Sequence, residues 1–243
     1  MSGPRKVIVN ADDLGYTPLT STGILTAWRD GLVTSASLMV RMPDAESAVR
    51  QARELGFDDL GLHLDLGEWI CRNGRWSPLY EVVALDDPQA VADECRRQLD
   101  RFRDLVGRDP THLDSHQHVH RAEPVRSVAR EIAARLGIVL RDFSSTVAYD
   151  GGFYGQYGDG KPASECITEE AIVSILERAT AVVVEIGCHP GLDPNLETMY
   201  CRERQREVEV LCGPGLRSRL AAAGFEPTTF LALGPQAAPE PAT

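Results

Sequence analysis

The chain has 243 residues, 43% of them hydrophobic, and carries a formal net charge of −11 at pH 7. A chain of this length can bury a large core without disulfides or structural metals. Its acidic balance argues against a nucleic-acid partner, because like charges would repel the phosphate backbone. No apolar run reaches the ~18 residues that a membrane span needs, and the first residues lack the apolar segment of a secretory signal. We therefore expect a cytoplasmic protein with no membrane partner.

Six cysteines are scattered along the chain, and no two are spaced as a Cys-x-x-Cys pair. In a cytoplasmic protein this pattern indicates free thiols, not a disulfide framework or a zinc cage. Cys188 stands beside His189, which suggests a nucleophile and its base. Neighbours on a strand point to opposite faces, however, so we do not expect this pair to act together.

In the first third of the chain, β-rich runs alternate with helical patterns. We expect strands over 6–10, 34–40 and 60–66, with helices over 19–30 and 45–55 between them. Gly31 and Gly56 follow the two helices and are candidate C-caps. The next segment, 67–87, has no clear period and is expected to be irregular; it carries Trp69, Trp76 and Tyr80.

The alternation continues to the C-terminus. Pro88 suits the first turn of a helix over 88–106, and Thr168 is a candidate N-cap for a helix over 167–180. Further helices are expected over 122–136 and 200–223, and strands over 111–115, 138–141, 181–187 and 227–233. Residues 144–166 are predicted to be a long loop rich in Gly and Tyr, and residues 234–243 a disordered tail.

Alternating strands and helices predict an α/β fold with a parallel sheet and right-handed crossovers. About seven strands fall within what we expect to be one catalytic domain, residues 1–233. A nearly closed (β/α) barrel and an open doubly wound sheet both fit this order. In either fold, chemistry gathers at the carboxyl ends of the strands.

Polar side chains do follow the expected strands. Each has a structural explanation when taken alone, because Asp favours turns and a single buried His can be a core residue. The run HLDSHQHVH (112–120) is different, since several histidines beside an aspartate are typical of metal binding or acid–base chemistry. One carboxylate with two imidazoles would suit Zn²⁺, Co²⁺, Ni²⁺, Mn²⁺ or Fe²⁺. The strand-end residues are Asn10, Asp12, Asp13, His63, Asp65, Asp114, His116, His118, His120, Arg141, Asp142, His189 and Asp193.

Four segments in order, NADDLG, GLHLDL, THLDSHQHVH and EIGCHPG, resemble the motifs of the YdjC-like carbohydrate deacetylase family. The match runs from about residue 6 to residue 233. It implies a distorted (β/α) barrel related to polysaccharide deacetylases. It also implies removal of acetyl groups from chitooligosaccharides or related N-acetylglucosamine compounds. Leu14 and Gln117 depart from the residues that the family often has there, Phe and His.

The resemblance further implies a divalent metal ion held by Asp13, His63 and His116, with Asp12 as the general base. His189 matches a histidine that lines the family's active site, and it is our candidate general acid, with His118 as the second choice. The metal is expected to be Zn²⁺ or Mg²⁺, with Co²⁺, Ni²⁺ and Mn²⁺ as alternatives.

Other residues are expected to support these groups. Arg141 could orient Asp12 through a bidentate ion pair, and Asp114 could orient a ligand histidine. The aromatic residues could stack on a sugar, or could instead cover the barrel or form a homodimer contact. These aromatic residues are Trp69, Trp76, Phe153, Tyr154 and Tyr157.

Two other functions compete with deacetylation. A metal-dependent phosphoester hydrolase would favour extra Lys or Arg at the strand ends or a Gly-rich phosphate loop, and the chain offers mainly Arg141. A non-catalytic sugar- or metal-binding protein would be expected to have lost its base or a ligand, yet the base and all three ligands are present.

Overall fold

Parallel strands form the centre of the molecule. The structure, a computed structural model, describes residues 4–157 and 160–236. The strand order of its main sheet is β7-β6-β3-β2-β1-β9-β8, and β10 pairs with the start of β1. All its pairings are parallel. The strands are β1 (Arg5–Leu14), β2 (Ser35–Leu38), β3 (Leu60–Leu64), β6 (His112–Ser115), β7 (Val139–Leu140), β8 (Val147–Asp150), β9 (Val183–Cys188) and β10 (Phe225–Pro227).

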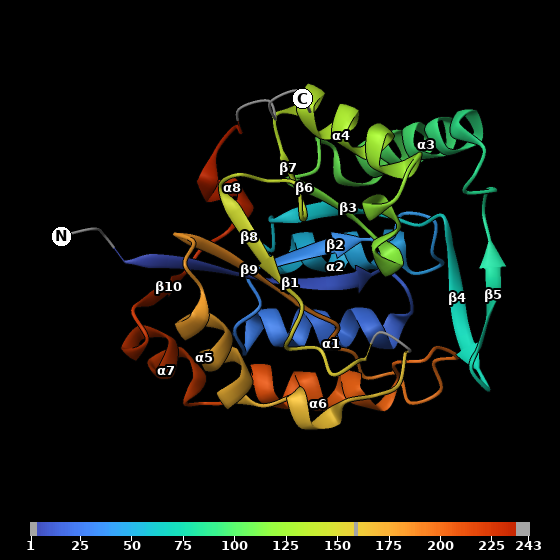
Figure 1. Cartoon of the computed structure of the whole chain (residues 1–243). Helices are drawn as coiled ribbons and strands as arrows, with labels where there is room; N and C mark the ends of the chain where they lie inside the picture. Colours follow the sequence, from blue (N-terminus) through green and yellow to red (C-terminus); the bar gives the residue numbers. More distant parts are fainter. Residues whose placement is uncertain (1–3, 158–159, 237–243) are drawn as a thin grey trace.

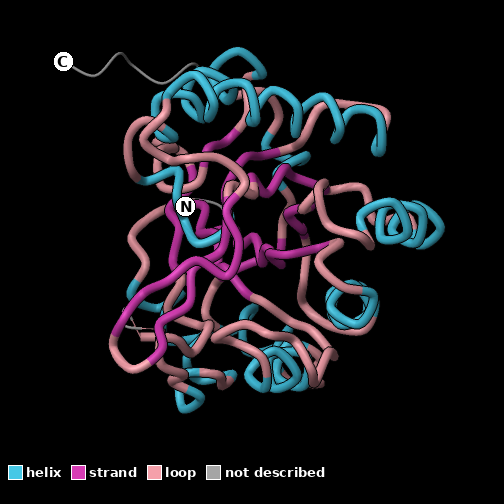
Figure 2. The backbone as a smooth tube through the Cα atoms, turned by 90° about the vertical axis from the view of Figure 1, so that its right-hand side faces the viewer, coloured by secondary structure: helices cyan, strands magenta, loops and turns pink. Residues whose placement is uncertain are grey.

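This sheet curves into a nearly closed barrel. Its outermost strands, β7 and β8, do not pair with each other. Val139 of β7 and Val147 of β8 nevertheless belong to one buried apolar cluster, together with Ile8 and Phe230. Figure 2 shows the strands in the middle with helices around them. The expected barrel of about seven parallel strands is therefore confirmed.

Helices cover the outside of the barrel (Figure 1). Among the residues that the structure describes, no helix is long and apolar enough to cross a membrane. The helices are α1 (Pro18–Arg29), α2 (Ala45–Leu55), α3 (Pro88–Val106), α4 (Val125–Leu136), α5 (Glu169–Arg178), α6 (Arg202–Leu211), α7 (Leu216–Ala222) and α8 (Phe230–Leu233), with 3₁₀ turns η1 (His116–Arg121) and η2 (Ser164–Cys166).

Local sequence signals set several helix ends. The Asp87 side chain accepts hydrogen bonds from two backbone N–H groups at the start of α3, where Pro88 occupies the first turn. Thr168 caps α5 in the same way, as predicted, by accepting from the N–H of Ala171. Gly56 ends α2 with a φ of 77°, a left-handed conformation that favours glycine. The predicted bounds of α2 and α3 agree with the structure.

The segment 67–87, expected to be irregular, contains an antiparallel hairpin of β4 (Gly67–Arg72) and β5 (Arg75–Glu81). Asn73 and Gly74 make its turn, with φ angles of 53° and 74°. Turns with two positive φ angles match the twist of paired strands and favour Asn-Gly, a signal that the prediction overlooked. The hairpin lies beyond the end of the barrel toward which β1 runs (Figure 1).

Three more predictions for the second half are wrong. Residues 144–166 are not all loop, because they include β8, which pairs with β9, and the turn η2. The helix expected over 200–223 breaks into α6 and α7 at Gly213 and Pro214, where proline cannot continue the hydrogen-bond ladder. The strand expected over 227–233 ends at Pro227, and Thr229 then caps the short helix α8.

The predicted tail, 234–243, is only partly described, and residues 237–243 lie outside the described residues. Gln236 is held by two contacts: its backbone N–H donates to the carbonyl of Gly137 at 2.8 Å, and its side chain accepts from Thr146 at 2.7 Å. Gln236 is therefore held against the residues that follow α4 and precede β8, and the disordered tail stays a prediction.

Gly61 in β3 is required by its neighbour in the core. A Cβ at this position would lie 2.3–2.5 Å from ring atoms of the buried His112. We expect Gly61→Ala to lower the free energy of unfolding by about 1–3 kcal/mol, since overpacking a core forces side chains and backbone to shift. Urea denaturation would measure this. Gly215→Ala is the matched control, because its added methyl would meet only a Glu169 oxygen at 3.8 Å; an equal effect of both substitutions would refute the steric explanation.

Candidate active site and metal centre

The candidate site begins where β1 leaves the sheet. The register between β1 and β2 shifts between Ala11 and Leu14, and Asp13 has a φ of 70°. An irregularity of this kind re-aims side chains at a strand end. Asp12 and Asp13 are both buried, and their side chains contact different residues.

Asp13 meets two histidines from other strands. Its Oδ1 lies 3.3 Å from Nε2 of His63 on β3 and 3.1 Å from Nδ1 of His116, just after β6. Donor atoms from all three residues lie within 4.8 Å of one another, and all three side chains are buried. A tetrahedral ion with bonds of about 2.0–2.2 Å would separate its ligand atoms by about 3.3 Å. The three residues expected to bind metal therefore fit one divalent cation.

Further contacts hold these donors in place. His63 uses its other ring nitrogen, Nδ1, to contact Oδ1 of Asp114 at 2.7 Å, an arrangement that is usual for a ligand histidine. Asp13 uses its second oxygen, Oδ2, to accept from Nη2 of Arg204 at 2.6 Å. The atoms of His63 and Asp13 that face the cluster are therefore left available to bind a cation.

Arg204 and Glu68 were missed by the sequence analysis. Arg204 comes from α6, which carries no recognisable motif, so only the fold brings it to Asp13. Glu68 comes from the hairpin that was expected to be irregular; its Oε2 lies 3.5 Å from Nε2 of His116 and accepts from Tyr16 at 2.7 Å. The Nε2 of His116 has no hydrogen-bond partner among the described residues, so this ring has a free buried nitrogen.

Asp12 is paired with a buried arginine. Nη1 and Nη2 of Arg141, which follows β7, donate to its two oxygens at 2.6 and 2.8 Å. The same guanidinium contacts Glu185 and Asp114. Burial by itself would raise the pKa of Asp12, but the charge of Arg141 outweighs it and the pKa is lowered. Asp12 is therefore an ionised carboxylate at neutral pH.

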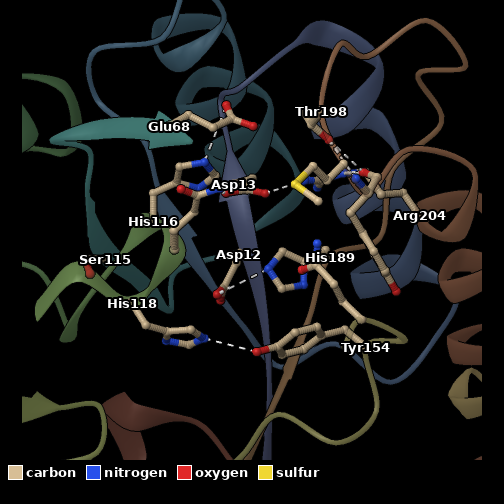
Figure 3. Close-up of a pocket in the computed structure, with 14 residues that line it drawn as sticks. Asp12, Asp13, Glu68, Ser115, His116, His118, Tyr154, His189, Thr198 and Arg204 are labelled. Atoms are coloured by element: carbon tan, nitrogen blue, oxygen red, sulfur yellow. Dashed lines mark hydrogen bonds and ion pairs between the residues drawn. The ribbon is translucent and has the colours of Figure 1, made fainter. Parts of the chain in front are cut away.

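His189 lies opposite Asp12 (Figure 3), with its Nε2 3.8 Å from Oδ2. Its ring is 4.7 Å from that of Tyr154, and its backbone N–H donates to Glu207. Burial disfavours the charged imidazole and lowers the pKa of His189 to about 4, despite the nearby carboxylates. His189 is therefore neutral near pH 7 and must gain a proton before it can donate one.

A cavity of about 80 Å³ opens onto both aspartates, His116, His118, Tyr154, His189 and Arg204. His118 contacts the Tyr154 hydroxyl at 3.1 Å (Figure 3). Trp69 does not line this cavity; its backbone is held by the side chain of Gln117. Of the other aromatic residues that were expected to stack on a sugar, Phe153 is buried in the core, whereas Trp76 and Tyr157 are 52% and 54% exposed. Only Tyr154 of this aromatic set reaches the cavity.

Binding of a cation should release protons. Burial lowers the pKa of both candidate ligand histidines, but the carboxylates outweigh it: Asp114 raises the pKa of His63 to about 10, and Asp13 raises that of His116 to about 9. Both rings are then protonated at pH 7 in metal-free protein, whereas a ligand ring must be neutral. We expect about two protons released per ion at pH 7, and affinity rising steeply toward pH 9. Calorimetry in buffers of different ionisation enthalpy counts these protons; binding heats independent of buffer would contradict this.

Comparison with known proteins identifies the family of this chain. The family model of YdjC-like proteins matches residues 6–222. The chain belongs to the YdjC-like family. A chitooligosaccharide deacetylase of Salmonella paratyphi C is 33% identical over 93% of this chain and 98% of its own length. Chitooligosaccharide deacetylases from Salmonella agona and Salmonella newport match over the same shares, also with 33% identity. The family resemblance is therefore confirmed.

Two solved structures share the fold of this YdjC-like protein. A proposed cellobiose-phosphate cleavage protein of Enterococcus faecalis V583 superposes with a TM-score of 0.76 and 25% identity, over 95% of this chain and 99% of that one. A family 4 carbohydrate esterase of Streptomyces lividans, solved with acetate, gives a TM-score of 0.52 with 13% identity, over 98% and 100% of the two chains. The second similarity concerns the fold alone.

Proposed function

We propose that this protein hydrolyses the N-acetyl group of an acetylated amino sugar, a chitooligosaccharide or a related N-acetylglucosamine compound, and needs a divalent metal ion to do so. The observation that carries the proposal is the position of Asp13 Oδ1, 3.1 and 3.3 Å from nitrogens of two histidines, beside a second, ionised carboxylate. The name of the Salmonella relatives supports the substrate class.

Asp13, His63 and His116 would hold the ion. Zn²⁺ suits one carboxylate and two imidazoles best, and Mg²⁺, Co²⁺, Ni²⁺ and Mn²⁺ are the alternatives to be tested. Such an ion polarises a carbonyl and makes a nearby water more acidic. Arg204 fixes Asp13 through Oδ2, and Asp114 fixes the ring of His63. These two contacts keep the donor atoms aimed at one point.

Asp12 would act as the general base. Its lowered pKa keeps it charged at neutral pH. Oδ1 already accepts from Arg141 and Asn10, whereas Oδ2 accepts only from Arg141 and keeps a second acceptor site for a proton from water. The bidentate pair with Arg141 also fixes the direction in which the carboxylate points.

His189 would then protonate the departing amine, which is a poor leaving group as an anion. It is neutral at rest, and its Nε2 lies 3.8 Å from Oδ2 of Asp12, so the two side chains would have to approach slightly, or share a water, for His189 to receive the proton taken from water. Tyr154 packs against its ring, and Glu207 holds its backbone N–H. His118 remains the second choice, because its Nε2 already contacts the Tyr154 hydroxyl.

The competing functions fit this cavity less well. Arg204 is the only Lys or Arg among the described residues that line it, and Asp13 already pairs with it. A phosphoester substrate would need free positive charge to bind its anionic oxygens. A purely sugar-binding protein would have no use for a buried, paired base beside three donor side chains.

Acetate release tests the proposal. Protein stripped with a chelator would be given Zn²⁺, Mg²⁺, Co²⁺ or Mn²⁺ and incubated with diacetylchitobiose and other N-acetylated amino sugars. We expect acetate only after metal is restored, and none from O-acetylated or phosphorylated sugars lacking the N-acetyl group. Metal-independent acetate release would reject the metal role. Failure with every N-acetyl sugar, with metal bound, would reject the substrate class.

A further inference from the structure

A second group of metal-ligand side chains lies beside the first. His118, His120 and Asp142 offer donor atoms that all lie within 4.8 Å of one another. None of the three belongs to the Asp13, His63 and His116 cluster. We propose that His118, His120 and Asp142 form a second binding site for a divalent cation of the zinc class. This inference stands on its own contacts and does not depend on the proposed function.

His120 provides the strongest support. Its side chain is fully buried, and its Nδ1 lies 2.6 Å from the Ser115 hydroxyl. That leaves Nε2, which lies 3.5 Å from Oδ2 of Asp142 and has no hydrogen-bond partner among the residues that the structure describes. A buried ring nitrogen is rarely left unpaired in a native structure. A cation between this nitrogen and the carboxylate would satisfy it.

His118 repeats the pattern. Its Nε2 contacts the Tyr154 hydroxyl at 3.1 Å, whereas its Nδ1 is buried and has no partner among the described residues. Histidines that bind metal usually place their other ring nitrogen on an oxygen, which fixes the tautomer and the ring. Ser115 and Tyr154 would supply those oxygens for His120 and His118.

The fold explains why these residues meet. Strands β6 and β7 are hydrogen-bonded neighbours, and their chains leave the sheet at the same end. After β6, Gln117 and His118 have φ angles of 51° and 54°; after β7, Asp142 has a φ of 67°. These left-handed conformations are costly for residues other than glycine, and they cluster at functional sites. Here they place histidines from one segment beside the carboxylate of the other.

The donor set selects the kind of ion. Two imidazoles and one carboxylate favour zinc and similar transition ions over Mg²⁺ or Ca²⁺, which prefer oxygen donors. One residue opposes binding: Arg121 donates from Nε to the same Oδ2 of Asp142 at 2.8 Å, with its side chain about half exposed (47%). A cation must share the carboxylate with this guanidinium, so removal of Arg121 should strengthen the site.

The test counts zinc ions. Chelator-stripped wild type, His120→Gln and Asp142→Asn would be dialysed against Zn²⁺, and bound metal would be measured by mass spectrometry. We expect two ions per wild-type chain and one ion in either variant. Asp109→Asn is the matched control, since it removes a half-exposed carboxylate that is paired with Arg103 and belongs to none of the candidate metal clusters; it should retain two ions.

Arg121→Gln adds a test in the opposite direction, and we expect it to lower the Kd of the second ion several-fold. One ion per wild-type chain, or two ions retained in both His120→Gln and Asp142→Asn, would overturn the proposal. A zinc ion bound to free cysteine thiols would remain bound in both variants, and its persistence would distinguish it from an ion at the proposed site. His63→Ala reports on the first site separately, because it should remove the other ion.

Discussion

Replacing Asp12 by asparagine should lower kcat by roughly 10²–10⁴-fold, the usual worth of a positioned general base, while metal content stays unchanged. The carboxamide has the same shape but cannot take a proton from water at neutral pH. Asp12 itself touches Arg141, Asn10 and, at 3.8 Å, His189. Its carboxylate also lies near His63 and Asp114, but it is not one of the three donors of the Asp13 cluster. Acetate release and bound metal would be measured on the same preparation.

Asp193→Asn is the control for this substitution. Asp193 follows β9 and accepts from Thr17, but it does not line the cavity. Its replacement should leave kcat within a few-fold of wild type. Denaturation curves would show whether loss of the Arg141 pair unfolds Asp12→Asn; Arg141 keeps Glu185 and Asp114 as partners, so we expect a folded protein. Full activity in Asp12→Asn would show that another group is the base.

The residues that the sequence could predict share one property: they lie at or just beyond the carboxyl ends of strands. In a parallel barrel all strand ends meet at one edge, so Asp13, His63 and His116 could be expected to converge although 103 residues separate the first from the last. The alternation of strand and helix patterns predicted a parallel α/β fold, and the family resemblance favoured the barrel over the open sheet. Both predictions rest on the hydrophobic period of short segments and on the order of the predicted elements along the chain.

The residues that the sequence did not predict come from elements whose position relative to the site follows no pattern in the sequence. Arg204 is one of several arginines on the polar helix α6, and no local pattern distinguishes the one that turns inward. Glu68 lies on the hairpin, whose Asn73-Gly74 turn carried the only short-range signal. Glu207 is fully buried and holds the His189 backbone, yet in sequence it resembles any helix-surface glutamate. Tertiary packing decides these positions.

Removing a proposed ligand should have the second large effect. In His63→Ala and His116→Ala, we expect the chelator-stripped protein to regain no metal at this site, and turnover to fall by roughly 10³-fold or more, since metal activation is worth several kcal/mol. The cause is the donor set: one carboxylate with a single imidazole leaves too few protein ligands for a zinc-type centre. Bound metal and acetate release would be measured together.

In the same experiment, Asp114→Asn distinguishes a residue that binds the metal from a residue that only orients a metal ligand. Asp114 contacts Nδ1 of His63 but belongs to the polar network around Arg141, so its loss should weaken metal affinity by about 10–100-fold, as for other residues that orient a ligand histidine. Excess metal should therefore restore occupancy in Asp114→Asn and fail to do so in His63→Ala. Equal behaviour of the two variants would mean that His63 acts only through the buried network, and the ligand assignment would have to move to other donors.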